Sequence, residues 1–327
     1  MSIFETTRVN VRVGEDEIGF ETGKLAKQAS GAVVVTAGDT MVLSTATMGG
    51  KRDVDFLPLT VDVEERMYAV GKIPGSFFRR EARAGEKATL TARMIDRPIR
   101  PLFPKGWHFE TQLVTIPMSV DQEHPYDILA MNGASAALAI SEIPVAKHVG
   151  AVRVGKLDGD FVVNPNEADH GNLDLDLIVA GTDEAILMVE AGANGVTEAE
   201  ILDALDIAHG EIKKIVGAIE ELRQKVGKEK LVIEEPKLDE SLVSEVESAF
   251  GAKIKEAAAV QTKIERQDAL GAVKDEVVEK FAPADADGNV DSARASEAKS
   301  VFSKIEKETI RQAIAVLLVA VPVTAMV

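Results

Sequence analysis

The residues best suited to chemistry in this chain lie between positions 71 and 105, where two adjacent phenylalanines precede a series of arginines. Phe77 and Phe78 follow Pro74 and Gly75, a pair typical of a turn, so we expect the two rings on a loop. Aromatic faces stack on unpaired bases of any sequence, at about 1–3 kcal/mol per base, and neighbouring guanidinium groups pair with phosphates. The combination favours single-stranded RNA or DNA as the ligand.

The same stretch is basic although the whole chain is acidic. Residues 71–105 contain nine basic and three acidic residues, whereas the 327-residue chain has a net charge of −17. A positive field confined to one place attracts a polyanion to that place. The candidate RNA-binding residues are Phe77 and Phe78 for the bases, and Arg79, Arg80, Arg83, Arg93, Arg97 and Arg100 for the phosphates.

Both groups of residues also have a purely structural interpretation. The two phenylalanines could be core residues at the end of a β-hairpin, although alternation along a strand would bury only one of two neighbours. Arg93, Arg97 and Arg100 are spaced four and three residues apart, which places them on one side of a helix. That side is either a phosphate track or a solvated face on which Asp96 forms a salt bridge.

Composition narrows the class of protein. The chain has no cysteine, which excludes disulfides and thiolate metal sites and is typical of the reducing cytoplasm. Its start shows no signal-peptide pattern, and no stretch is apolar enough over about 18 residues to span a bilayer. The five histidines are scattered, and Asp174 and Asp176 read as the solvent face of a strand. We therefore expect a cytoplasmic protein with no membrane segment, and no catalytic residue or metal ligand that the sequence alone identifies.

The elements that must position the arginines alternate between strand and helix periodicity over residues 1–227. Helices are expected at 86–95, 126–141 and 198–226; the first should end near Asp96 because prolines follow, and the last begins with a capping box of Thr197 and Glu200. Strands are expected at 8–13, 33–36, 41–45, 56–63, 111–120, 151–154, 161–163, 173–180 and 185–189, with a hairpin between the second and third. This mixture predicts an α+β domain.

The remainder of the chain has a different pattern. Residues 238–314 lose the β-branched runs and predict a small all-α domain, with helices at 242–250, 252–260, 261–281 and 292–314. The acidic stretch 285–291 resembles a calcium loop, but its glycine stands at the fourth position instead of the sixth, so a solvated turn is expected. Residues 315–327 form an atypical apolar tail.

The segments FFRRE and EKATLTARMIDRPIRPLFP resemble the first RNase PH-like domain of bacterial polynucleotide phosphorylase (polyribonucleotide nucleotidyltransferase). The resemblance extends back through GAVVVTAGDTMVLSTATM and onward to about Lys307. Ala82 stands where this family usually has glycine, and Ala84-Gly85 stand where it has Pro-Ser. The implied fold is an RNase PH-like domain of mixed sheet and helices followed by a small helical domain.

The resemblance also implies a function. Enzymes of this family degrade single-stranded RNA, including mRNA, from 3′ to 5′: inorganic phosphate attacks the terminal phosphodiester and releases a nucleoside diphosphate. They depend on magnesium and form homotrimeric rings, and their phosphate and magnesium ligands belong mainly to a second RNase PH-like domain, which we expect to be absent from this chain. By resemblance, Phe77 and Phe78 would stack on bases, Arg79, Arg80 and Arg83 would hold the backbone, and Arg93, Arg97 and Arg100 would line the path. The alternative is a non-catalytic RNA-binding or assembly module.

Overall fold

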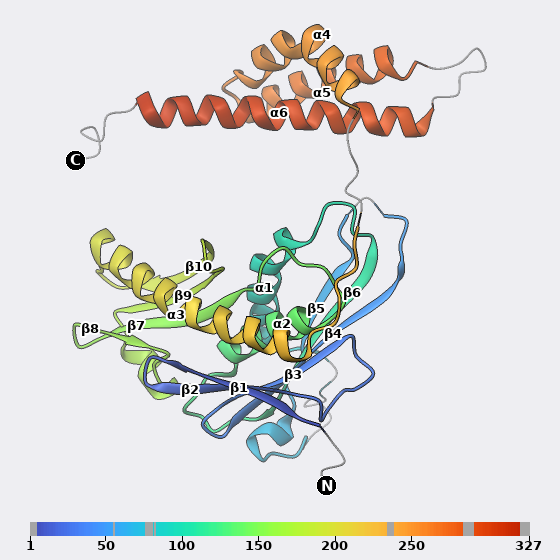
Figure 1. The fold of residues 1–327 in the computed structure, drawn as a ribbon. Helices are drawn as coiled ribbons and strands as arrows, with labels where there is room; N and C mark the ends of the chain where they lie inside the picture. The colour runs from blue at the N-terminus through green and yellow to red at the C-terminus, as the bar shows by residue number, and fades with distance from the viewer. Residues whose placement is uncertain are drawn as a thin grey trace. The chain divides into compact units, whose positions relative to one another are not determined.

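The computed structural model describes residues 5–54, 56–75, 81, 83–233, 239–283 and 291–320, with side chains up to residue 315. The chain divides into two compact units, Met1–Glu235 and Pro236–Val327 (Figure 1). The first unit combines two sheets with helices, and the second is helical throughout its described part. The predicted α+β class is therefore confirmed.

A six-stranded sheet forms one layer of the first unit, in the order β1-β2-β3-β4-β6-β5. Its strands are β1 (Thr7–Val13), β2 (Asp16–Thr22), β3 (Gly31–Ala37), β4 (Thr40–Lys51), β5 (Leu59–Val63) and β6 (Phe109–Ser119). The predicted hairpin is confirmed by the antiparallel pair β3 and β4, whose turn places Gly38 at a φ of 52°. Only β5 and β6 pair in parallel among these strands, so the segment between them crosses over the sheet and carries a helix.

A four-stranded antiparallel sheet forms the second layer, in the order β10-β9-β7-β8. It consists of β7 (Gly150–Leu157), β8 (Asp160–Val163), β9 (Leu175–Gly181) and β10 (Ile186–Ala193). The first six residues of the central strand β7 are all buried, and one of them is Arg153. A buried arginine in an apolar strand requires acidic partners, because an unpaired charge is costly away from water.

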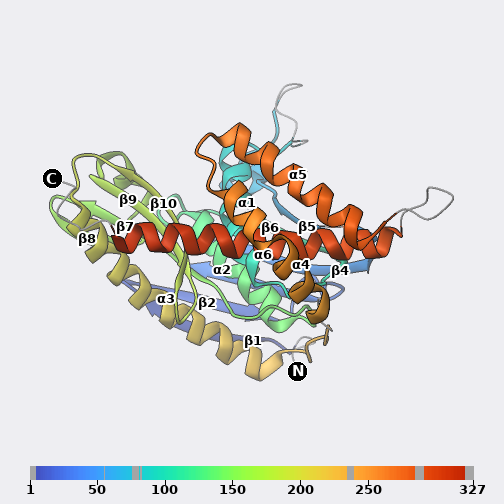
Figure 2. The same cartoon turned by 90° about the horizontal axis from the view of Figure 1, so that it is seen from above.

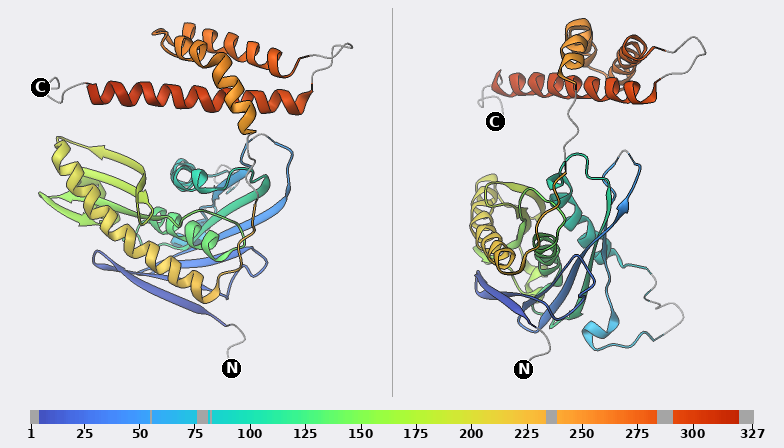
Figure 3. Two further views of the ribbon diagram at one scale, coloured as in Figure 1. Left: turned by 45° about the horizontal axis from the view of Figure 1, so that its top comes forward. Right: turned by 45° about the vertical axis from the view of Figure 1, so that its right-hand side comes forward.

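Helix α2 (Tyr126–Ile140) lies between the two sheets and is buried at every position, as its small residues predicted. A Cβ added to Gly133 would lie 2.4 Å from Ser44 Oγ, so only glycine allows this approach to β4. Helix α3 (Glu198–Val226) packs against β1, β7, β9 and α2 (Figures 2 and 3). Its predicted start is confirmed, since Thr197 and Glu200 form a capping box.

Helix α1 (Glu86–Ile99) is longer than the sequence indicated. The prediction that it ends near Asp96 was wrong, because the helix continues through Pro98, and the N–H of Arg100 still donates to the carbonyl of Asp96. A proline there removes one backbone donor in the last turn, and the buried Pro98 ring packs in the core. Three short 3₁₀ helices, η1 (Met67–Val70), η2 (Arg100–Leu102) and η3 (Glu167–Asn172), complete the unit.

The second unit contains α4 (Glu240–Ala258), α5 (Lys263–Phe281) and α6 (Ser292–Ala320), which share a core that includes Phe250, Ile254 and Phe302. The predicted break near Gly251 was wrong, because α4 is continuous there. Phe250 and Ile254 both reach the core at helical spacing, and their burial outweighs the cost of about 1 kcal/mol for an internal glycine. No helix of the described residues is long and apolar enough to cross a membrane. Most of the acidic stretch 285–291 lies outside the described residues, as does the tail from 321.

Candidate nucleic-acid interface

Helix α1 presents its arginines on the side that faces away from the core. Ala88, Thr91 and Ile95 are buried against the rest of the unit, whereas Arg93 and Arg97 are exposed. The spacing of three and four residues separates these two faces as an amphipathic helix requires. The helix therefore holds two cationic side chains at fixed positions above the sheet layers.

Arg93 and Arg97 line a pocket of about 560 Å³, which we call the arginine pocket. Its walls come from α1, α2 and η3 and from strands β7 and β10, all in the first unit. Five basic side chains line it: Lys87, Arg93, Arg97, Arg153 and His170. Four acidic side chains, Glu86, Asp127, Glu167 and Glu190, also line it, so the formal charges of the lining balance. A phosphate chain would therefore depend on those cations that no acidic side chain already holds.

Most acidic residues around the arginine pocket are paired; the exception is Glu86, which has no partner among the described residues. Arg97 bonds Glu190 of β10, and Lys87 Nζ donates to Glu167 Oε1 over 3.1 Å. Arg93, in contrast, has no hydrogen-bond or ion-pair partner among the residues that the structure describes, although its side chain is exposed. Its guanidinium is the cation of this pocket most available to a ligand.

The third predicted arginine, Arg100 at the start of η2, does not join Arg93 and Arg97. Arg100 donates to both carboxylate oxygens of Asp96, at 2.9 and 2.6 Å, and to the carbonyls of Leu57 and Leu59 at 3.2 and 3.1 Å. These bonds attach the end of α1 to the start of β5. For Arg100, the structure therefore has the salt bridge with Asp96 that the sequence analysis gave as the alternative to a phosphate track.

The loop residues of the sequence prediction lie mostly beyond what the structure describes. Phe77, Phe78, Arg79 and Arg80 fall outside the described residues, so their predicted contacts stay predictions. Arg83 is described; it is exposed and lines a second pocket next to the arginine pocket.

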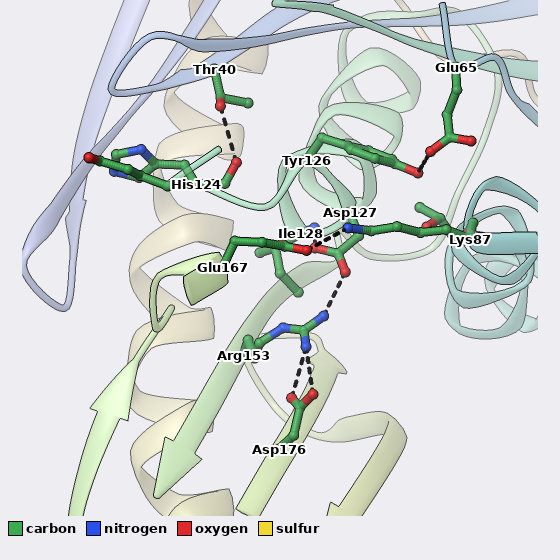
Figure 4. Close-up of polar contacts among 12 residues, drawn as sticks. Thr40, Glu65, Lys87, His124, Tyr126, Asp127, Ile128, Arg153, Glu167 and Asp176 are labelled. Carbon is green, nitrogen blue, oxygen red and sulfur yellow. Dashed lines mark hydrogen bonds and ion pairs between the residues drawn. The ribbon is translucent and has the colours of Figure 1, made fainter. Parts of the chain in front are cut away.

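The buried arginine of β7 forms the floor of the arginine pocket. Arg153 is 6% exposed; it donates to Asp127 Oδ2 at 2.6 Å and to both oxygens of Asp176 at 2.9 and 2.7 Å (Figure 4). The reading of Asp176 as the solvent face of a strand was therefore incomplete, because its carboxylate holds Arg153. An arginine inside the apolar run 151–154 was the signal that could have found this cluster.

The second pocket, of about 650 Å³, begins on the other side of the Lys87–Glu167 ion pair, and both residues line both pockets. We call it the tyrosine pocket, because Tyr126 lines it and donates its hydroxyl to Glu65 Oε1 at 2.7 Å (Figure 4). Burial and the hydrogen bond to Glu65 raise the pKa of Tyr126 above its ordinary value. Tyr126 is therefore a fixed hydrogen-bond donor rather than a titrating group.

A cluster around His124 lies at the edge of the tyrosine pocket and joins the segment before α2 to the starts of β2 and β4. His124 Nδ1 lies 2.7 Å from Asp121 Oδ2 and its Nε2 lies 3.5 Å from Asp16 Oδ1, while Thr40 donates to Asp121 at 2.9 Å. Burial alone would lower the pKa of His124, but the two carboxylates raise it above 6.5. Burial would likewise raise the pKa of Asp121, but backbone and side-chain hydrogen bonds, first that from the His124 N–H, hold it well below 3.8.

This cluster predicts a pH-dependent stability. The pKa of His124 is raised on folding, so its stabilising contribution is fully present below about pH 6.5 and is lost as pH rises through the folded pKa. We expect the difference in melting temperature between the wild type and His124→Gln to shrink as the buffer is changed from about pH 6 to about pH 9. A difference that is constant over this range would show that His124 carries no charge-dependent contribution.

The described residues contain no group of three or more His, Asp or Glu side chains placed to hold a metal ion. Most carboxylates nearest the arginine pocket are instead paired with arginine or lysine.

Three family models match successive parts of the chain. Residues 16–144 match domain 1 of the 3′ exoribonuclease family, and residues 147–211 match domain 2 of the same family. Residues 241–316 match the RNA binding domain of polyribonucleotide nucleotidyltransferase. The first two matches lie within the first compact unit and the third lies within the second.

Most of the chain also aligns with curated relatives that are named polyribonucleotide nucleotidyltransferase. The polyribonucleotide nucleotidyltransferase of Bacillus pumilus is 46% identical over 299 residues, 91% of this chain and 42% of the relative. That of Natranaerobius thermophilus is 45% identical over 314 residues, 94% of this chain and 44% of the relative. The chain thus spans less than half the length of these relatives. The crystal structure of rice (Oryza sativa) Rrp46 aligns with a TM-score of 0.49 and 17% identity, over 67% of this chain and 94% of that one.

Proposed function

Because this chain belongs to the polyribonucleotide nucleotidyltransferase family, we propose that it guides single-stranded RNA toward the catalytic site of a phosphorolytic 3′-to-5′ exoribonuclease. The resemblance seen in the FFRRE and DRPIRPLFP segments is confirmed by the family models and by the relatives. Membership of this family indicates RNA as the polymer, and the arginine pocket is the place where this chain would bind it.

The observation that carries the proposal is the exposed guanidinium of Arg93, which no described residue pairs with, beside Arg97 and Lys87. Three cations along one wall of a pocket suit consecutive phosphates of a strand, and such contacts hold a backbone without reading its sequence. In the proposed path, Arg83 continues this track past the start of α1. Phe77 and Phe78 would stack on the bases, and Arg79 and Arg80 would hold the adjoining backbone.

Arg100 has a different place in the proposal. Its donors to Asp96, Leu57 and Leu59 hold the end of α1, so it would position Arg93 and Arg97 and leave the phosphates to them. Arg100 would thus affect RNA binding indirectly, by stabilising the end of α1. Arg100 therefore belongs to the site as a support for its cationic face.

The complete reaction is proposed for the longer protein that the relatives represent. Inorganic phosphate would attack the 3′-terminal phosphodiester of the RNA and release a nucleoside diphosphate, in a cytoplasmic homotrimer that requires magnesium. The magnesium ligands would lie outside this chain. In this reaction the present chain would bind and orient the RNA strand.

One observation favours the second candidate, a non-catalytic RNA-binding module, for the isolated chain. Asp127 and Asp176 are paired with Arg153, Glu167 with Lys87, and Glu190 with Arg97. A general acid or base must be able to exchange its proton with the substrate. Around the arginine pocket these four carboxylates are held by cations, whereas Glu86 is not paired with any described residue.

The experiment incubates the purified chain with poly(A), magnesium and inorganic phosphate, and measures both RNA binding and release of ADP. We expect poly(A) to bind and no ADP to be released, because the chain would guide RNA without cleaving it. ADP release that scales with phosphate would mean that this chain holds a working centre. Failure to bind poly(A) at low salt would overturn the guiding role itself.

A further inference from the structure

The tyrosine pocket shares Lys87 and Arg83 with the proposed phosphate track, but the rest of its lining has no role in that track. We propose that it binds one RNA base that carries an amino group, while the phosphates of the same strand lie in the arginine pocket. This inference rests on the proposed function and names a subsite within it. Its volume of about 650 Å³ falls in the range of roughly 300–1,000 Å³ that is typical of ligand pockets.

The walls of the tyrosine pocket suit the face of a base. Met67 and Val70 of η1, Pro117 of β6 and the following Val120 contribute apolar surface, whereas Tyr126 is only 6% exposed and adds little to it. The 3₁₀ helix η1 is held in place because the N–H of Val120 donates to the carbonyl of Ala69 at 2.9 Å. An apolar slot that is already formed binds a flat ring without the cost of ordering its walls.

Of the polar groups that line the pocket, which also include Arg66, Arg83 and Gln122, we assign the preference to Glu65 because it lies beside Tyr126. Glu65 Oε1 accepts the Tyr126 hydroxyl, whereas Oε2 has no hydrogen-bond donor among the residues that the structure describes. A carboxylate oxygen accepts from the exocyclic amino group of a base, as acidic side chains do with the amino group of cytosine. Uracil has carbonyl oxygens in place of an amino group, so this carboxylate disfavours it. Adenine, cytosine and guanine each supply the donor.

Lys87 links the base subsite to the phosphate track. Its Nζ lies 3.1 Å from Glu167 Oε1 and 5.3 Å from the centroid of the Tyr126 ring, and Lys87 lines both pockets (Figure 4). A strand that crosses Lys87 would place a phosphate against α1 and turn the adjoining base toward Tyr126. Sugar, phosphate and base would then be held by neighbouring surfaces of one unit.

The test measures binding of fluorescent A12 and U12 oligonucleotides to the full 327-residue chain by anisotropy at one salt concentration. Val70→Trp fills the tyrosine pocket from η1, and Ala84→Trp fills it from the segment before α1. Leu202→Trp is the matched control, because Leu202 is exposed on α3 and does not line the pocket. We expect each pocket variant to bind A12 about tenfold more weakly, the effect of losing about one base stack, with U12 unchanged.

Glu65→Gln tests the polar contact separately. The glutamine keeps an oxygen for the Tyr126 hydroxyl and replaces the free acceptor by an amide donor. We expect it to reduce the preference for A12 over U12 with little change in U12 binding. The proposal is overturned if both tryptophan variants keep the wild-type affinity for A12, or if they weaken A12 and U12 equally.

The same assay separates failure of this inference from failure of the guiding role. The double variant Arg93→Ala, Arg97→Ala should weaken A12 and U12 alike if the phosphate track exists. If it does so while the tryptophan variants have no effect, the base subsite is wrong and the guiding role stands. If the double variant has no effect on either oligonucleotide, the guiding role fails.

Discussion

Replacing Arg153 with methionine is expected to lower the free energy of unfolding of the first unit by about 3–5 kcal/mol. The change leaves Asp127, which is 4% exposed, without the cation that holds it, and removes the partner of Asp176. A buried charge that has lost its partner costs far more than an exposed one, because no water replaces the lost contact. Urea denaturation followed by circular dichroism measures the change.

Two further variants make the result specific to the buried cluster. Arg97→Met also breaks an arginine–carboxylate pair, but that pair is exposed, so the expected loss is below about 1 kcal/mol. Adding Asp127→Asn to Arg153→Met should recover part of the stability, because it removes the unpaired charge. If Arg153→Met and Arg97→Met destabilise the unit equally, the cluster has no special energetic role.

The double variant Arg93→Ala, Arg97→Ala is expected to give the largest effect on RNA binding. Each phosphate contact on a single strand contributes about 0.7 to the slope of log K against log salt concentration, so losing two contacts should reduce the slope by about 1.4. Folding should be preserved, since both side chains are exposed and the buried face of α1 is unchanged. Binding of U12 at several salt concentrations measures the slope.

Arg52→Ala is the matched control for this prediction. Arg52 is also an exposed arginine with an acidic partner, Glu110, and it lines neither the arginine pocket nor the tyrosine pocket. A general loss of charge would lower the slope for both variants, whereas a defined track is sensitive only at Arg93 and Arg97. An unchanged slope in the double variant would rule out phosphate contacts at these two residues.

The features that sequence predicted best are those with short-range causes. The capping box of Thr197 and Glu200 and the turn at Gly38 arise from residues within a few positions of each other. The small residues of α2 also predicted that this helix is buried, because close packing against a sheet leaves no room for larger side chains. Such signals are present in the sequence whatever the rest of the chain does.

The features that sequence missed depend on partners that are distant along the chain. Pro98 and Gly251 are local helix breakers, but burial of their neighbours in a core outweighs the local preference. The pairing of Arg153 with Asp176 joins residues on two strands, and the lysine–glutamate pair between the pockets joins α1 to η3. Spacing in the sequence cannot show which acid meets which base, so the two pockets became visible only in three dimensions.

The parallel pairing of β5 with β6 has a consequence for how this family can vary. The chain leaves the sheet after β5 and returns at β6, and the segment before α1 that carries the predicted RNA contacts lies inside this excursion. The entropy of closing such an excursion grows only with the logarithm of its length, so that doubling it costs roughly 0.6 kcal/mol. Insertions and deletions between β5 and α1 are therefore cheap for folding. The reach of the segment that is predicted to contact RNA can thus change by selection while the two sheets keep their register.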